Sequence, residues 1–103
     1  MQRKHLKTLN IIFTKPISAN IKWADIEALF IALGAQVNER AGSRIAVVLD
    51  GEVQVYHRPH PQPTTDKGAV ASVRKWLDGL GYSPINGANE LKDTAPVTND
   101  NEE

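Results

Sequence analysis

The chain of 103 residues contains no cysteine. Disulfide frameworks and thiolate metal sites are therefore excluded, and nothing indicates an oxidising compartment. Long apolar runs are also missing, and residues 1–10 are polar and basic, a pattern that indicates neither a membrane span nor a secretory signal. We expect a cytoplasmic protein without membrane contact, and a length of 103 residues corresponds to one small domain.

Acidic residues are scarce in the first part of the chain. None occurs before Asp25, whereas five Lys or Arg residues precede it. Residues 1–82 hold eleven basic and seven acidic residues, a net charge of +4, and residues 83–103 hold one and five, a net charge of −4. A basic surface favours phosphate-bearing ligands with salt-dependent affinity, but a mild basic excess is also common in soluble domains.

Two segments have apolar residues at helical spacing. The first, residues 6–13, predicts a short N-terminal helix that ends before Pro16. The second has apolar residues at positions 26, 29, 30 and 33 and is followed by Gly34, which predicts a helix over roughly residues 23–33.

Between residues 35 and 57 the pattern becomes that of strands. We expect three of them, over residues 36–40, 44–49 and 52–57, separated by turns at residues 41–43 and at Asp50-Gly51. The middle strand is apolar on both faces, as expected at the centre of an antiparallel meander.

A last helix follows a proline-rich loop. Thr65 or Asp66 is expected to cap it, and Gly81 to stop it. The predicted fold class is therefore α+β, a three-stranded antiparallel meander with helices on one face in the order α-β-β-β-α, plus an N-terminal helix. We divide the chain into a basic extension (1–22), a folded domain (23–82) and an acidic tail (83–103) that is predicted to be disordered.

The hairpin allows a prediction of register. If Asp50-Gly51 is a two-residue turn, Arg44 lies opposite His57. Alternation then places these two residues on one face with four apolar residues, and we expect this face to receive the helices. Arg44 and His57 would then both contact one phosphate at the edge of the helix-covered face. The four apolar residues are Ala46, Val48, Val53 and Val55.

Two of the three histidines, His57 and His60, lie around the proline-rich loop. Because the unperturbed pKa of histidine is near neutrality, a pair three residues apart is a candidate acid–base site. His57 is equally compatible with the plain end of an edge strand, and His60 with a rigid turn or a protein interface. A metal site is not favoured, because the sequence offers neither cysteine nor a clear third ligand.

Several short motifs occur along these elements, namely Leu33-Gly34, Gly42-Ser43, Pro59-His60-Pro61, Lys67-Gly68 and Ser72-Val73-Arg74. In their order and spacing, the motifs and the elements resemble the HicA toxins of bacterial type II toxin–antitoxin systems. The resemblance covers about residues 23–82. It implies a fold like the double-stranded-RNA-binding domain, metal-independent cleavage of mRNA, no cofactor, and a HicB-type antitoxin that covers the site in a hetero-oligomer.

The sequence departs from HicA toxins at one position. In that family a Gly-Ser-His motif supplies the catalytic histidine, whereas Gly42-Ser43 is followed here by Arg44, and a guanidinium cannot act as a base. Either His57 has taken the role, or His60 has, or the protein only binds RNA or its antitoxin. We favour His57, because the predicted register places it beside the vacated position.

Phosphate contacts are expected from four cations near these motifs. Arg44 would bind a phosphate with two hydrogen bonds, and Lys67 would add positive charge where the last helix begins. Arg58 and Lys75 are further candidates, although each is also compatible with an ordinary solvated side chain.

Overall fold

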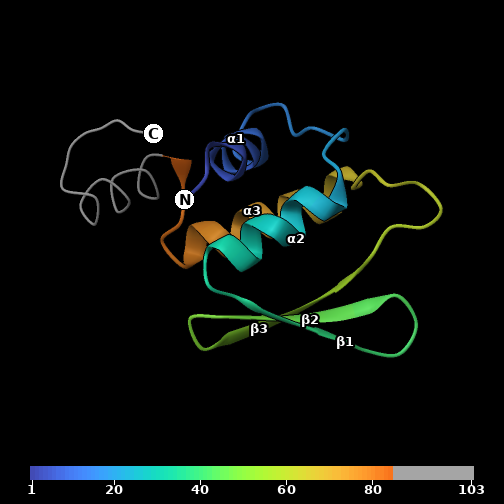
Figure 1. Ribbon diagram of the computed structural model, residues 1–103. Helices are drawn as coiled ribbons and strands as arrows, with labels where there is room; N and C mark the ends of the chain where they lie inside the picture. The colour runs from blue at the N-terminus through green and yellow to red at the C-terminus, as the bar shows by residue number, and fades with distance from the viewer. Residues whose placement is uncertain (85–103) are drawn as a thin grey trace.

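The computed structural model describes residues 1–84, so nearly all of the predicted tail, residues 83–103, lies outside the described residues. The elements are as predicted, and the α+β class is confirmed. None of the helices within residues 1–84 is long and apolar enough to span a membrane. The helices are α1 (Arg3–Ile12), α2 (Trp23–Ala32) and α3 (Lys67–Gly79), and the strands are β1 (Gln36–Glu39), β2 (Arg44–Leu49) and β3 (Glu52–His57), in the antiparallel order β1-β2-β3 (Figure 1).

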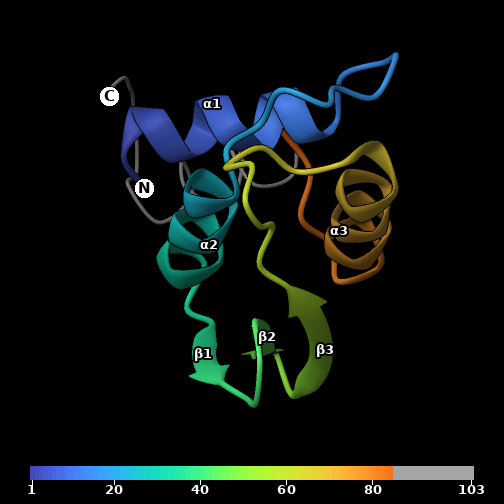
Figure 2. The same cartoon turned by 90° about the vertical axis from the view of Figure 1, so that its right-hand side faces the viewer.

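The elements form three layers. Figure 2 shows the sheet on one side, α2 and α3 next to each other in the middle, and α1 across the outer side of both helices. Leu9 and Ile12 of α1 are fully buried, as expected for the apolar stripe of an amphipathic helix that packs on a core. The predicted N-terminal helix is confirmed, and it completes the hydrophobic core.

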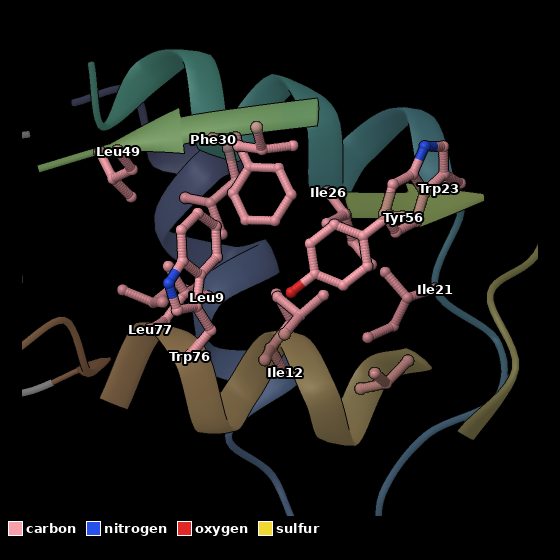
Figure 3. Close-up of a cluster of buried hydrophobic side chains, with 14 of the residues drawn as sticks. Leu9, Ile12, Ile21, Trp23, Ile26, Phe30, Leu49, Tyr56, Trp76 and Leu77 are labelled. Carbon is pink, nitrogen blue, oxygen red and sulfur yellow. The ribbon is translucent and has the colours of Figure 1, made fainter. Parts of the chain in front are cut away.

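Four aromatic side chains fill the space between the sheet and the two middle helices (Figure 3). Phe30 of α2 stacks on Tyr56 of β3 with ring centroids 5.9 Å apart, and Trp76 of α3 meets the edge of Phe30 at 5.8 Å. Trp23 packs against Tyr56 at 5.6 Å. Because aromatic side chains bury large areas, this cluster determines which face of β3 turns inward.

The helices cover the face of the sheet opposite to the one predicted. Tyr56 and Val47 are buried against the helices, whereas Val53 and Val55 are 56% and 53% exposed. The prediction that Arg44 and His57 share the helix-covered face is therefore wrong, and both lie on the open face. The physical reason is that β2 is apolar on both faces, so its sequence does not indicate which face turns inward. The face that carries Tyr56 of β3 turns toward the helices, because the tyrosine ring packs into the aromatic cluster.

The predicted register between β2 and β3 is confirmed. Arg44 is the partner of His57, and Leu49 is the partner of Glu52. Asp50 and Gly51 have φ values of 52° and 81°, the left-handed conformations that a two-residue hairpin turn of type I′ requires.

Candidate functional site

The candidate site is centred on a cross-strand pair at one end of the sheet. The N–H of Arg58 donates a hydrogen bond of 2.8 Å to the carbonyl of Ser43. Hydrogen-bonded and non-hydrogen-bonded pairs alternate along an antiparallel ladder, so the next pair, Arg44 and His57, belongs to the non-hydrogen-bonded kind. Side chains approach each other most closely in such pairs. Both residues are exposed on the open face, within reach of an extended ligand.

The turn before β2 positions the side chain of Arg44. Its Nε donates a hydrogen bond of 3.2 Å to the carbonyl of Ala41, and Gly42 has the positive φ of 71° that this tight turn needs. The two terminal nitrogens of Arg44 have no hydrogen-bond partner among residues 1–84. They are therefore free to bind the oxygens of a phosphate.

Arg58 is held by two carboxylates on the helix-covered side. It donates hydrogen bonds of 2.7 and 3.1 Å to Glu27 of α2, and one of 3.3 Å to Glu39 of β1. The hydrogen bonding with Glu27, reinforced by Glu39, raises the pKa of the guanidinium above its ordinary value. Trp23 also donates its indole N–H to Glu27. Arg58 thus ties the end of β3 to α2, and its charge is compensated within the fold.

The remaining predicted residues lie outside the Arg44–His57 pair. His60 is exposed in the proline-rich loop, three residues beyond His57. Lys67 opens α3 directly after the N-cap Asp66, whose carboxylate accepts a hydrogen bond from the N–H of Ala69, and Lys75 is exposed two turns further along. Because α3 covers the opposite face of the sheet, its lysines do not point to the face that carries Arg44 and His57.

The proline-rich loop is fastened where α2 and α3 begin. The N–H of Trp23 donates to the carbonyl of Pro63 at 3.0 Å, and the N–H of Thr65 donates to the carbonyl of Ile21 at 2.8 Å. These two bonds flank a short antiparallel bridge between Lys22 and Thr64. Figure 2 shows the loop rising from the end of β3 between the two helices. The bridge therefore limits how far the loop that carries His60 can move.

A groove that the sequence did not indicate runs along α2, beside the end of β3 and the proline-rich loop. Its volume is about 570 Å³. Ile31, 59% exposed, lies off the buried stripe of α2, which is the only local signal for this groove. The lining residues are Trp23, Ala24, Glu27, Ala28, Ile31, Arg58, Pro59 and Pro63.

The chemistry available at the site is acid–base and cationic. Within residues 1–84 no group of three His, Asp or Glu side chains is arranged as metal ligands. The described part of the chain has a net charge of +4, with eleven basic and seven acidic residues. An imidazole beside a partly unpaired guanidinium suits an anionic substrate from which a proton is removed.

The chain matches a model of a known protein family. A family model described as the HicA toxin of bacterial toxin–antitoxin systems matches residues 23–78, more than half of the chain. The match begins with α2, includes all three strands and ends one residue before the end of α3, so α1 lies outside it. No curated protein and no solved structure matches the chain.

Proposed function

Because the chain belongs to the HicA family and is a toxin of a bacterial toxin–antitoxin system, we propose that it is an endoribonuclease that cleaves mRNA without a metal ion. We further propose that a HicB-type antitoxin neutralises it. The observation that carries the proposal is the pairing of His57 with Arg44, directly after Gly42-Ser43. This pairing supplies an imidazole next to the position at which HicA toxins have their histidine.

Cleavage without a metal uses the ribose as the nucleophile. The 2′-oxygen bonds to the neighbouring phosphorus while the bond to the 5′-oxygen breaks, which yields a 2′,3′-cyclic phosphate and a 5′-hydroxyl. A base must remove the 2′-hydroxyl proton, an acid must protonate the leaving oxygen, and a cation must stabilise the charged phosphorane.

The proposed roles follow from the positions of three side chains. His57 takes the proton from the 2′-hydroxyl, and the terminal nitrogens of Arg44 bind the phosphate oxygens beside it. His60, in the adjoining loop, is the candidate acid for the leaving oxygen. Because these residues are exposed, a single RNA strand can reach them without opening the fold.

The decisive experiment is cleavage of a single-stranded mRNA in the presence of EDTA. We expect the wild-type protein to release 5′-hydroxyl ends, and His57→Ala to lower kcat/KM by about 10²–10⁴-fold, the typical worth of proton transfer. His5→Ala, at the remaining histidine, is the matched control and should leave the rate unchanged. Cleavage that survives both His57→Ala and His60→Ala would contradict the assignment of the site.

A second function has one observation in its favour. Arg44 occupies the position of the family's histidine, so a module that binds RNA or antitoxin without cleaving is the alternative. Arg44→His separates the two functions. If the wild-type protein is a nuclease, this substitution weakens RNA binding and lowers the rate, and if the wild-type protein is silent, it is the substitution expected to introduce cleavage.

A further inference from the structure

The two edges of the sheet differ in how they are protected. β1 has only four residues, three of them polar and exposed. β3 has six residues, pairs with β2 without a bulge, and contains neither lysine nor proline. Short length, charge, proline and bulges are the usual devices that keep an edge strand from pairing with another chain. Apart from Glu52 at its start, β3 has none of them.

The free edge of β3 adjoins an apolar stripe on the open face of the sheet. The pair of Leu49 and Glu52 closes the two-residue turn, so alternate residues of β3 bond to β2 and the others, Val53, Val55 and His57, direct their N–H and C=O groups outward. No strand within residues 1–84 pairs with these groups. Val53 and Val55 are also among the most exposed large hydrophobic side chains of the described chain.

We propose that β3 is a dimerisation edge, on which a second copy of this chain pairs its own β3 in antiparallel orientation. A two-fold axis would place the same row of free backbone groups and the same valine stripe against each other. The proposal goes beyond the nuclease function and does not depend on it.

The charges along the hairpin favour the antiparallel second copy. Asp50 lies in the turn before β3 and Glu52 at its first position, where the Glu52 carboxylate accepts a hydrogen bond of 3.4 Å from Trp76 on the helix-covered face. His57 lies at the other end of β3, beside Arg44 of β2. Antiparallel pairing brings the acidic end of one copy to the basic end of the other, whereas parallel pairing brings like charges together. The joined sheet has six strands, and both of its remaining edges are the short, polar β1. The Arg44–His57 pair of each copy lies at an outer end of the joined strands.

Sedimentation velocity over a range of protein concentrations tests the dimer. We expect the wild-type protein to dimerise, and Val55→Lys to weaken the dimer at least tenfold because the lysine lies within the new strand pair. Ile31→Lys is the matched control, because Ile31 is as exposed as Val55 but lies on α2, and it should leave the dimer unchanged. Circular dichroism verifies that both variants are folded.

Single cysteines test the orientation, because the chain has no cysteine of its own. Opposed residues in a hydrogen-bonded antiparallel pair have Cα atoms about 5.5 Å apart, which suits a disulfide. Mild oxidation is applied to Val53→Cys alone, to Val55→Cys alone and to a mixture of the two variants, which report the pairs 53–53, 55–55 and 53–55. An antiparallel dimer has one register, so we expect only one of these three pairs to form a disulfide efficiently. Efficient linking of both 53–53 and 55–55 is incompatible with one antiparallel register and overturns the orientation.

Three outcomes overturn the proposal of a β3 dimer. One is a protein that stays monomeric up to its solubility limit, which would leave the edge free for an extended segment of the antitoxin. Another is a dimer that Ile31→Lys abolishes and Val55→Lys does not, which would place the interface at the groove along α2. The third is a dimer in which none of the cysteine combinations cross-links. None of these outcomes depends on whether the protein cleaves RNA.

Discussion

The carboxylate of Glu27 accepts two hydrogen bonds from the guanidinium of Arg58, of 2.7 and 3.1 Å, although the residues are 31 positions apart. The side chain of Glu27 is only 16% exposed and also accepts the indole N–H of Trp23. This carboxylate therefore joins the N-terminal half of α2 to the end of β3, beside the strand pair that carries Arg44 and His57.

We expect Glu27→Gln to lower the melting temperature more than Glu39→Gln. Each change removes a negative charge beside Arg58, but the side chain of Glu39 is 76% exposed, so water can replace most of what its carboxylate contributes. Thermal unfolding followed by circular dichroism measures the difference. Equal melting temperatures for the two variants would show that the short contact with Glu27 adds nothing to stability.

Removing core contacts of α1 should destabilise the whole domain. Leu9 is fully buried between α1 and the middle helices, so Leu9→Ala should lower the free energy of unfolding by about 2–5 kcal/mol. Leu6→Ala, at a half-buried position of the same helix, should cost less. Urea denaturation gives both values. A loss below about 1 kcal/mol for Leu9→Ala would mean that α1 is only loosely attached.

Alkaline pH should destabilise the protein through Tyr56. Burial raises the pKa of its phenol above the ordinary value of 10.0, and the nearby Ser72 side chain lowers it to a smaller extent. The folded state therefore holds the phenolic proton more tightly than the unfolded state does. The resulting stability is complete below pH 10 and is lost as the pH rises from there through the raised pKa. The loss is at most about 1.4 kcal/mol per pH unit.

Tyr56→Phe tests this prediction. The hydroxyl of Tyr56 is buried, and none of the described residues is placed to form a hydrogen bond with it. Its removal should raise the free energy of unfolding by roughly 1 kcal/mol at neutral pH and flatten the decline above pH 10. Tyr82→Phe serves as the comparison, because the Tyr82 hydroxyl donates to Asp50 at 2.9 Å. A marked loss of stability in Tyr56→Phe would show that the hydroxyl has a partner.

If the protein binds RNA at the Arg44–His57 pair, Arg44 should contribute more to the salt dependence of binding than the lysines of α3 do. Each phosphate contact to a single strand adds about 0.7 to the slope of log K against log salt concentration. Arg44→Ala should lower the slope by about that amount. Lys67→Ala and Lys75→Ala, on the helix that covers the opposite face of the sheet, should change it less. A lower slope for the α3 variants but not for Arg44→Ala, measured by titration at several salt concentrations, would place the RNA on the side of α3.

The hairpin shows how much of the site local sequence could predict. Asp50-Gly51 permits both left-handed conformations of a type I′ turn, and a turn of two residues sets the register of the strands beside it. The pairing of Arg44 with His57 was predictable for that reason. It depends only on positions counted from the turn.

Local sequence could not predict which face of the sheet the helices cover, nor that Arg58 pairs with a carboxylate. Val53 and Val55 alternate as an inward face would, but Tyr56 is the residue that packs into the aromatic cluster, so the valines point outward. Similarly, the sequence near Arg58 contains no carboxylate to pair with it, and only the fold places Glu27 of α2 beside its guanidinium.

The sequence by itself determined the helices, the strands, their order and their register, because caps, turns and periodicity act between residues close in the chain. Only the tertiary structure decided which face of the sheet the helices cover, that α1 completes the core, and which cations stay free for a ligand. These depend on contacts between residues far apart in the chain, where the burial of large side chains outweighs local alternation.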